Sequence, residues 1–198
     1  MSTQKEIDSA KATFLYAAIS DAQGTIKATD SKIAVLMVIL AIPLTKLGSI
    51  YRDCFALYSN ESRCVSNFSL ILICAFCLFW FLSFWAAMRA LNPVDNPSDH
   101  IDGEKPNGIF YSGGLFQPNF WAANFKCLSK SNRQIQHQLD QLPSSTENLV
   151  KELTFEHMKL VYIRTIKMKR LGYTFDFGRI WVFVGGILWL TSLYLNGH

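Results

Sequence analysis

The stretch from Phe68 to Met88, FSLILICAFCLFWFLSFWAAM, is 21 residues long and contains no charged side chain. An α-helix rises about 1.5 Å per residue, so a helix of this length crosses a hydrocarbon core of about 30 Å. Half of the 198 residues are hydrophobic and only 17% are charged. These features predict an all-α integral membrane protein.

Two further apolar runs are candidates for membrane-spanning helices. Ile180–Leu195 is uncharged and is flanked by Arg179. Ile33–Leu44 is short enough to suit a buried helix of a soluble protein as well. Because Thr45 can hydrogen-bond to its own helix and the next residue is a lysine that can reach toward water, a span is favoured here too. We expect two or three membrane helices, and three is the preferred number.

The basic residues predict the orientation, because Lys and Arg near the ends of spans favour the cytoplasmic side. Five bases precede the third run and none follows it, whereas Lys46, Arg52 and Arg63 argue for the opposite orientation. We expect the N-terminus and the central region in the cytoplasm. The predicted segments are an N-terminal amphipathic helix (1–32), a first span (33–50), an extracytoplasmic loop (51–66), a second span (67–91), a cytoplasmic helical bundle region (92–175) and a third span (176–195).

The cysteines give a further indication of the compartment. Cys54 and Cys64 both fall in the predicted outer loop, where a disulfide is possible. Cys74 and Cys77 have CxxC spacing but lie inside the second span, where thiols usually act as small apolar groups. No second pair of ligands accompanies them, so we expect no metal site.

A long helix is expected to start near Ser145. Serine is a favoured N-cap residue, and acidic residues follow it, as is common in the first turn of a helix. Its apolar residues form one stripe at helical spacing, and His157 and Arg164 fall in the middle of that stripe. Two interpretations are open. Arg164 either pairs with an acid on a neighbouring helix, or its guanidinium meets an anionic ligand.

Asp30 and Lys32 stand at the entrance to the first apolar run. They are expected at the inner membrane face, either as a pair that couples the cytoplasmic region to the spans or as a solvated interfacial pair. The sequence contains no nucleophile elbow, HExxH, Walker or dinucleotide motif, so we expect neither an enzyme nor a cofactor. The net charge of +4 is mild, and no nucleic-acid polymer is expected as a partner.

Several short motifs together resemble the transmembrane effectors of Pycsar, the pyrimidine cyclase system for antiphage resistance. The similarity covers roughly residues 10–195. It comprises the entry to the first span, the end of the second span, an aromatic insert, and the basic helix before the last span. The matching residues are Ala28, Asp30, Lys32 and Ala34; Arg89, Asn92 and Pro93; Ile109, Phe110, Tyr111, Ser112 and Gly113; and Lys159, Arg164, Lys167 and Arg170.

The resemblance implies an antiphage effector in the bacterial inner membrane. Such an effector would bind a cyclic pyrimidine mononucleotide, cCMP or cUMP, that a partner cyclase makes on infection. It would then impair membrane integrity and cause growth arrest or cell death. The alternative is a membrane-anchored helical adaptor that recruits a protein partner without any nucleotide.

The chemistry of the expected ligand suggests its site. Arg164 and Lys167 would meet the phosphate, Tyr111 or Tyr162 would stack on the base, and His157 lies in a distinctive setting between apolar residues. We also expect a homo-oligomer, because three helices cannot enclose an aqueous path alone. The Gly185-Gly186 pair in the last span would permit close helix approach.

Overall fold

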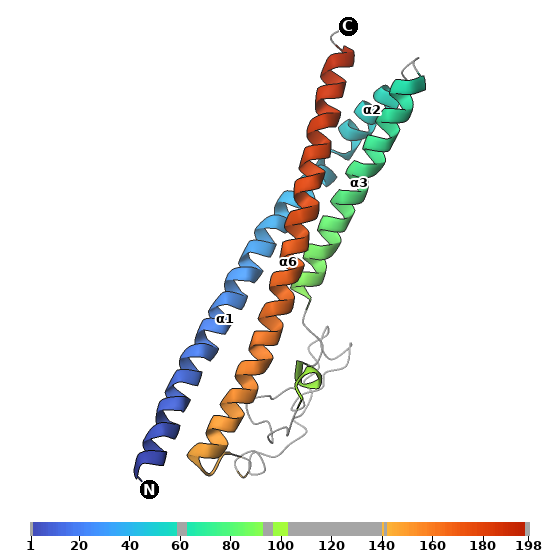
Figure 1. The fold of residues 1–198 in the computed structure, drawn as a ribbon. Coiled ribbons are helices and arrows are strands. Elements are labelled where there is room, and N and C mark those ends of the chain that lie inside the picture. The colour runs from blue at the N-terminus through green and yellow to red at the C-terminus, as the bar shows by residue number, and fades with distance from the viewer. Residues whose placement is uncertain (1, 59–62, 93–96, 103–139, 141, 197–198) are drawn as a thin grey trace, which may run out of the picture. The chain divides into compact units, whose positions relative to one another are not determined.

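The computed structural model describes residues 2–58, 63–92, 97–102, 140 and 142–196 (Figure 1). Within these residues every regular element is a helix and no strand occurs. The elements are α1 (Ser2–Thr45), α2 (Leu47–Tyr58), α3 (Arg63–Leu91), the 3-10 helix η1 (Pro97–His100) and α6 (Thr146–Asn196). The all-α prediction is therefore confirmed.

The chain forms two compact units. Unit 1 contains Met1–Thr25 and Asp95–Arg164, and unit 2 contains Ile26–Val94 and Thr165–His198. The long helices α1 and α6 contribute residues to both units, whereas α2 and α3 belong to unit 2 and η1 belongs to unit 1.

The first long helix ends at Thr45, five residues before the end that the sequence predicted for the first span. A turn follows at Lys46, whose N–H donates to the carbonyl of Pro43 at 3.1 Å. The carbonyl of Lys46 accepts from the N–H of Ile50 at 3.0 Å as α2 begins. The segment predicted as a loop over 51–66 therefore includes the end of α2, which packs on α3.

The last long helix starts where the sequence predicted. The Ser145 hydroxyl accepts a hydrogen bond from the N–H of Asn148 at 3.2 Å, which makes Ser145 the N-cap. Glu147 lies in the first turn, where a carboxylate interacts favourably with the helix dipole. No proline interrupts the helix, so α6 continues without a break to Asn196.

The core of unit 2 lies between α1, α3 and α6. Its buried members are Ile33, Leu40, Ala87 and Ala90, and the side chains packed against them are Met37, Trp80, Phe84, Leu171 and Trp181. Two interhelical hydrogen bonds add to this packing. The Trp80 indole donates to the Leu40 carbonyl at 2.8 Å, and the Ser83 hydroxyl donates to the Thr174 carbonyl at 2.9 Å.

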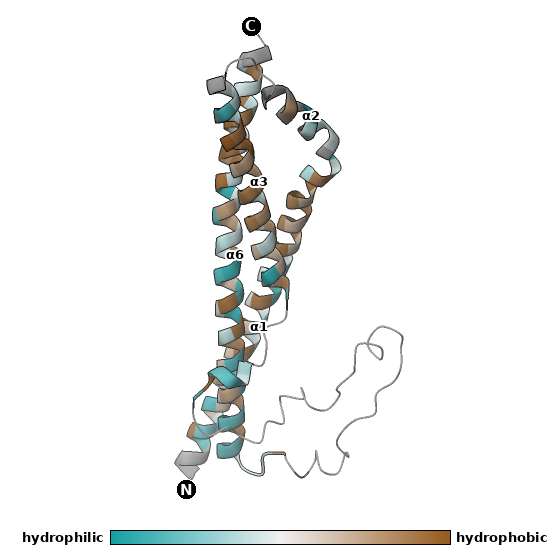
Figure 2. Cartoon of the chain, turned by 90° about the vertical axis from the view of Figure 1, so that its right-hand side faces the viewer, coloured by the Kyte–Doolittle hydropathy of each residue, from teal (hydrophilic) through white to brown (hydrophobic). Residues whose placement is uncertain are grey.

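Three helices are long and apolar enough to cross a membrane: Glu6–Thr45, Ser66–Leu91 and Thr146–Tyr194. Hydrophobic residues dominate α3 and the C-terminal part of α6 (Figure 2). Large apolar side chains such as Val182 and Ile71 are exposed there, which is the arrangement expected for a surface in contact with lipid. The chain is therefore a membrane-spanning protein with three candidate spans.

Candidate functional site

An open cavity lies in unit 1, between the N-terminal part of α1 and the first turns of α6. Its volume is about 400 Å³, within the range of about 300–1,000 Å³ that is typical of small-molecule sites. Its lining is mostly apolar and consists of Ala10, Lys11, Phe14, Leu15, Val150 and Thr154. Phe14 is 71% exposed, so its ring is available to a ligand in the cavity.

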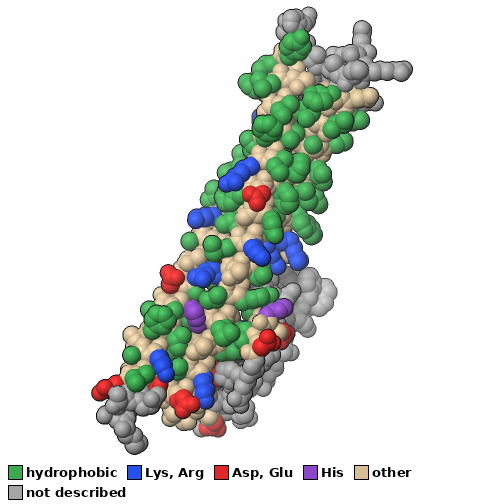
Figure 3. Space-filling view, viewed as in Figure 1, with side chains coloured by type: hydrophobic (Ala, Val, Ile, Leu, Met, Phe, Trp, Pro, Cys, Tyr) green, Lys and Arg blue, Asp and Glu red, His purple; other side chains and the backbone are tan. Residues whose placement is uncertain are grey.

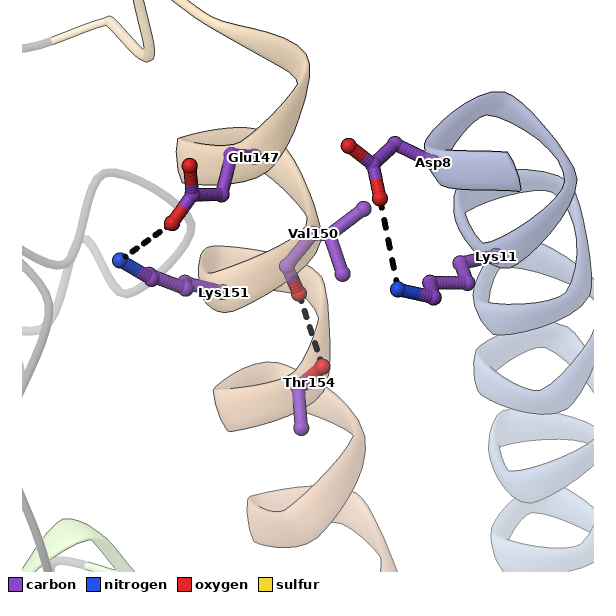
Figure 4. Close-up of polar contacts among 6 residues, drawn as sticks. All are labelled: Asp8, Lys11, Glu147, Val150, Lys151 and Thr154. Carbon is purple, nitrogen blue, oxygen red and sulfur yellow. Dashed lines mark hydrogen bonds and ion pairs between the residues drawn. The ribbon is translucent and has the colours of Figure 1, made fainter. Parts of the chain in front are cut away.

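The polar groups around this cavity are largely engaged with their own helices (Figure 4). The Lys11 ammonium lies 3.3 Å from the Asp8 carboxylate, one turn away on α1. The Thr154 hydroxyl donates to the carbonyl of Val150 at 2.8 Å. The cavity therefore offers one cation, which an incoming anion would share with Asp8.

A second cation, Arg164, lies farther along the same side of α6. Its guanidinium is 4.0 Å from the carboxylate of Asp21 on α1, at the outer limit of an ion pair. The Arg164 side chain is 32% exposed and that of Asp21 is 79% exposed, so water screens the pair. This contact matches the sequence interpretation in which Arg164 pairs with an acid on a neighbouring helix. The weak geometry leaves the guanidinium able to exchange that acid for another anion.

His157 lies between the cavity and Arg164. Val150, Thr154, His157, Val161 and Arg164 follow one another at intervals of three or four residues, which places them on one stripe of α6. His157 and Arg164 are two helical turns apart, about 10 Å along the axis. We call this stripe, together with Lys11, Phe14 and Asp21 of α1, the α1/α6 groove. The cavity lies at its end near Val150 and Thr154, and Arg164 and Asp21 lie at the other end.

Tyr162 does not share the α1/α6 groove with Arg164. Side chains two positions apart on a helix point in directions that differ by about 200°, so Tyr162 and Arg164 leave α6 on opposite sides. Tyr162 instead stacks on His100 of η1, with ring centroids 4.7 Å apart and an interplanar angle of 18°. The sequence analysis missed His100, because no periodic signal connects a Pro- and Asp-rich segment to one face of a helix.

Lys167, the other predicted phosphate ligand, forms an ion pair within unit 2. Its ammonium lies 2.5 Å from the Asp30 carboxylate, and the two side chains are 10% and 38% exposed. Asp30 thus pairs with a base of α6. Its described partner is Lys167, whereas Lys32 is exposed. Residues two apart on a helix do not face each other, which explains why Asp30 and Lys32 are separated.

Lys159, another base of the motif that matches the family, is buried. It pairs with Glu156, and its ammonium lies 5.2 Å from the ring centroid of Phe155. Arg170, a further base of α6, contacts the end of α3. The Arg170 guanidinium donates to the Arg89 carbonyl at 2.6 Å, close to the C-terminal end of α3.

Some predicted residues lie outside what the structure describes. Tyr111 is one of them, and so are the side chains of Cys54 and Cys64, so the possible disulfide stays a prediction. Cys74 and Cys77 are free thiols exposed on α3. Among the described residues, no group of three or more His, Cys, Asp and Glu side chains is placed to hold a metal ion.

Three candidate spans, together with charged stretches of α1 and α6 outside the most apolar segments, define a multi-pass helical membrane protein. A family model described as the Pycsar effector protein domain, PycTM, matches residues 14–195. The match covers nearly the whole chain, so the chain belongs to this family and is a Pycsar transmembrane effector in antiphage defence. No significant match was found among curated proteins or among solved structures.

This membership confirms the resemblance found in the sequence. It implies a functional link to a cyclic nucleotide and to the cyclase that makes it. The family is one of effector domains and is not a known family of enzymes.

Proposed function

We propose that this effector binds cCMP or cUMP, made by a partner cyclase on phage infection, and then impairs the integrity of the bacterial inner membrane. Growth arrest or cell death would follow before the phage matures. The observation that carries the nucleotide assignment is a loosely held cation, Arg164, at one end of the α1/α6 groove in a chain that belongs to the Pycsar effector family. The N-terminus and the central region face the cytoplasm in this proposal, where the nucleotide is made.

The groove offers the two kinds of contact that a cyclic mononucleotide needs. Its phosphodiester carries one negative charge, for which a planar guanidinium is the strongest partner, and its base has a π face that stacks on aromatic rings. Arg164 supplies the charge, and the His157 imidazole and the exposed Phe14 ring lie toward the other end. Lys11 is a second cation beside the cavity.

Tyr162 and Tyr111 remain the alternatives for the base contact. His100 already covers one face of the Tyr162 ring, so a base on that face would have to replace the imidazole. A site there would lie on the side of α6 opposite the α1/α6 groove. Substitutions on the two sides of the helix therefore distinguish the two positions.

In this proposal Lys167 couples the ligand site to the membrane spans and does not bind the ligand, because its ammonium is already paired with Asp30. The nucleotide can change the membrane spans only by binding one arrangement of the helices more tightly than another. Helices α1 and α6 belong to both units, so a rearrangement around the ligand is transmitted along them to the Asp30–Lys167 pair. Lys32, exposed near this pair in sequence, would act at the same membrane face.

The test is a titration of detergent-purified protein with cCMP, cUMP, cAMP and cGMP, followed by thermal unfolding. A ligand at one hundred times its Kd stabilises by about 2.7 kcal/mol, which for a chain of this size raises Tm by about 5–10 °C. We expect this rise with one or both pyrimidine nucleotides only. It should be lost in Arg164→Ala and kept in Lys151→Ala, a matched control whose exposed side chain pairs with Glu147 within the same helix.

Other results would change the assignment. A pyrimidine-selective rise that survives Arg164→Ala and disappears in Tyr162→Ala would place the ligand on the His100 side. No rise with any of the four nucleotides would favour the helical adaptor. The exposed aromatic side chains of Phe14 and Tyr16 on α1 are the observation that favours this second candidate, because a protein partner could cover them.

We also propose that several copies associate, because three helices cannot enclose an aqueous path alone. Gly185 contributes to packing within one copy, since a Cβ added there would lie 3.0 Å from the Phe76 ring. Gly186 is different, because a Cβ added there meets nothing within 4 Å. Of the Gly185-Gly186 pair, only Gly186 therefore leaves room for another helix to approach.

A further inference from the structure

Asp176 and Arg179 are two exposed charges on α6 in unit 2. They form an ion pair one turn apart, with 3.8 Å between the guanidinium and the carboxylate, and their side chains are 64% and 79% exposed. The side chain of Lys167, also on α6, is only 10% exposed, so Asp176 and Arg179 are much less covered by the rest of the chain. Their exposure matters because of their depth along the span.

Contacts between α3 and α6 fix that depth. Arg170 contacts the carbonyl of Arg89, the last charged residue of α3, so these two residues are level with each other. Farther along, Phe177 lies beside Phe79, with ring centroids 6.5 Å apart, and Trp181 lies beside Phe76 at 5.6 Å. Asp176 and Arg179 are therefore level with the middle of the uncharged run of α3.

The corresponding distances follow from the helical rise. On α3, the level of Asp176 lies about eight residues from Arg89 and that of Arg179 about eleven or twelve, which amounts to about 12 Å and about 17 Å. The hydrocarbon core is about 30 Å thick, so both charges lie near its centre if Arg89 marks its edge. Ionisable side chains at such depth face the interior of a helix bundle or a water-filled path, not lipid.

The neighbours of these charges form a continuous exposed seam along α6. The seam consists of Gly172, Asp176, Arg179, Phe183, Gly186 and Leu190, all of which are exposed. The intervals alternate between four and three residues, the repeat with which parallel helices pack in a left-handed supercoil. At Gly172 and Gly186 an added Cβ would meet nothing within 4 Å, so a second helix can approach closely at both levels.

We propose that this seam is the surface through which copies of the chain associate in the membrane, with a second copy of α6 as its partner. Copies inserted in the same orientation have parallel α6 helices. One acid and one base at successive seam positions make the seam self-complementary, because Asp176 of one copy can pair with Arg179 of the next. Charged and hydrophobic side chains lie close together on the face of the molecule that Figure 3 shows. The proposal names the contact surface of the proposed homo-oligomer and does not depend on nucleotide binding.

The test is disulfide cross-linking of the full chain in liposomes, after the five native cysteines have been replaced by alanine. Single cysteines are introduced by Phe183→Cys and Gly186→Cys in the seam. The matched controls are Tyr173→Cys and Trp189→Cys, at positions that are 54% and 64% exposed and lie about 100° around the helix from the centre of the seam, one on each side. We expect the seam cysteines to form covalent dimers at least fivefold faster than the controls under a mild oxidant.

Equal rates at all four positions, faster reaction at the controls, or no dimer at any position would overturn the proposal. A second measurement counts subunits by photobleaching of labelled protein in liposomes. Asp176→Asn combined with Arg179→Gln should reduce the oligomeric fraction at least threefold, whereas Arg179→Lys, which keeps the charge, should preserve it. An unchanged oligomeric fraction in the double variant would equally refute the proposal. Nucleotide binding is measured separately by thermal unfolding, so its failure and the failure of this proposal are distinguishable.

Discussion

The ion pair between Lys167 and Asp30 leads to an asymmetric prediction. The Lys167 side chain is 10% exposed and the Asp30 side chain is 38% exposed, so the two charges depend on each other to different extents. Asp30→Asn leaves a buried ammonium without its counter-charge, whereas Lys167→Met leaves a carboxylate that water can partly hydrate. The aspartate substitution should therefore be the more damaging of the two.

The magnitudes follow from the burial. Breaking a fully buried pair costs about 3–5 kcal/mol, and an exposed pair contributes about 0–1 kcal/mol. Because the lysine side chain is long and retains some exposure, we expect Asp30→Asn to lower the free energy of unfolding by about 2–3 kcal/mol. The partial exposure of Asp30 discounts the effect of Lys167→Met to about 1 kcal/mol. The double variant removes both charges and should recover more than half of the loss caused by Asp30→Asn.

The assay is unfolding of the purified chain in mixed micelles with a rising fraction of denaturing detergent, followed by tryptophan fluorescence. Trp80 and Trp181 pack against the core of unit 2 and report directly on it. Lys32→Met is the control. It removes an exposed charge from α1, the helix of Asp30, and should change the free energy of unfolding by less than about 0.5 kcal/mol. If Lys167→Met were as damaging as Asp30→Asn, or if the two losses simply added in the double variant, the burial argument would be wrong.

Three further predictions concern the membrane region. Both Gly185→Ala and Gly186→Ala gain the higher helix propensity of alanine, but at position 185 the new methyl group must also displace the Phe76 ring. Gly185→Ala should therefore be less stable than Gly186→Ala by about 1 kcal/mol in the same micelle titration, and equal stabilities would show that the ring moves without cost. Trp80→Phe removes the hydrogen bond to the Leu40 carbonyl and should cost about 0.5–1.5 kcal/mol, whereas a loss below measurement error would show that this bond contributes nothing. Co-expression with the cognate cyclase should depolarise the bacterial membrane in a dye assay while the effector alone should not; an unchanged potential in both cultures would contradict membrane impairment.

The sequence was sufficient for features that depend on neighbouring residues. An uncharged run of 21 residues predicts the second span by its length alone, and this helix is present as α3. Ser145 predicts the start of α6 because an N-cap bonds within its own turn. The short motifs around Asp30, Arg89 and Arg164 were also enough to indicate the Pycsar effector family, which the family model confirms.

Only the tertiary structure decided which side chains meet. The sequence grouped Lys167 with Arg164 as a ligand for phosphate, but packing gives Lys167 to Asp30, 137 positions away in the chain. It also pairs Tyr162 with His100 and sets α3 against α6 at the register that brings Asp176 and Arg179 level with uncharged residues. Helix formation is local, because each turn bonds to the turn before it. The register between helices depends on how side chains distant in sequence fit together, and no local pattern specifies that fit.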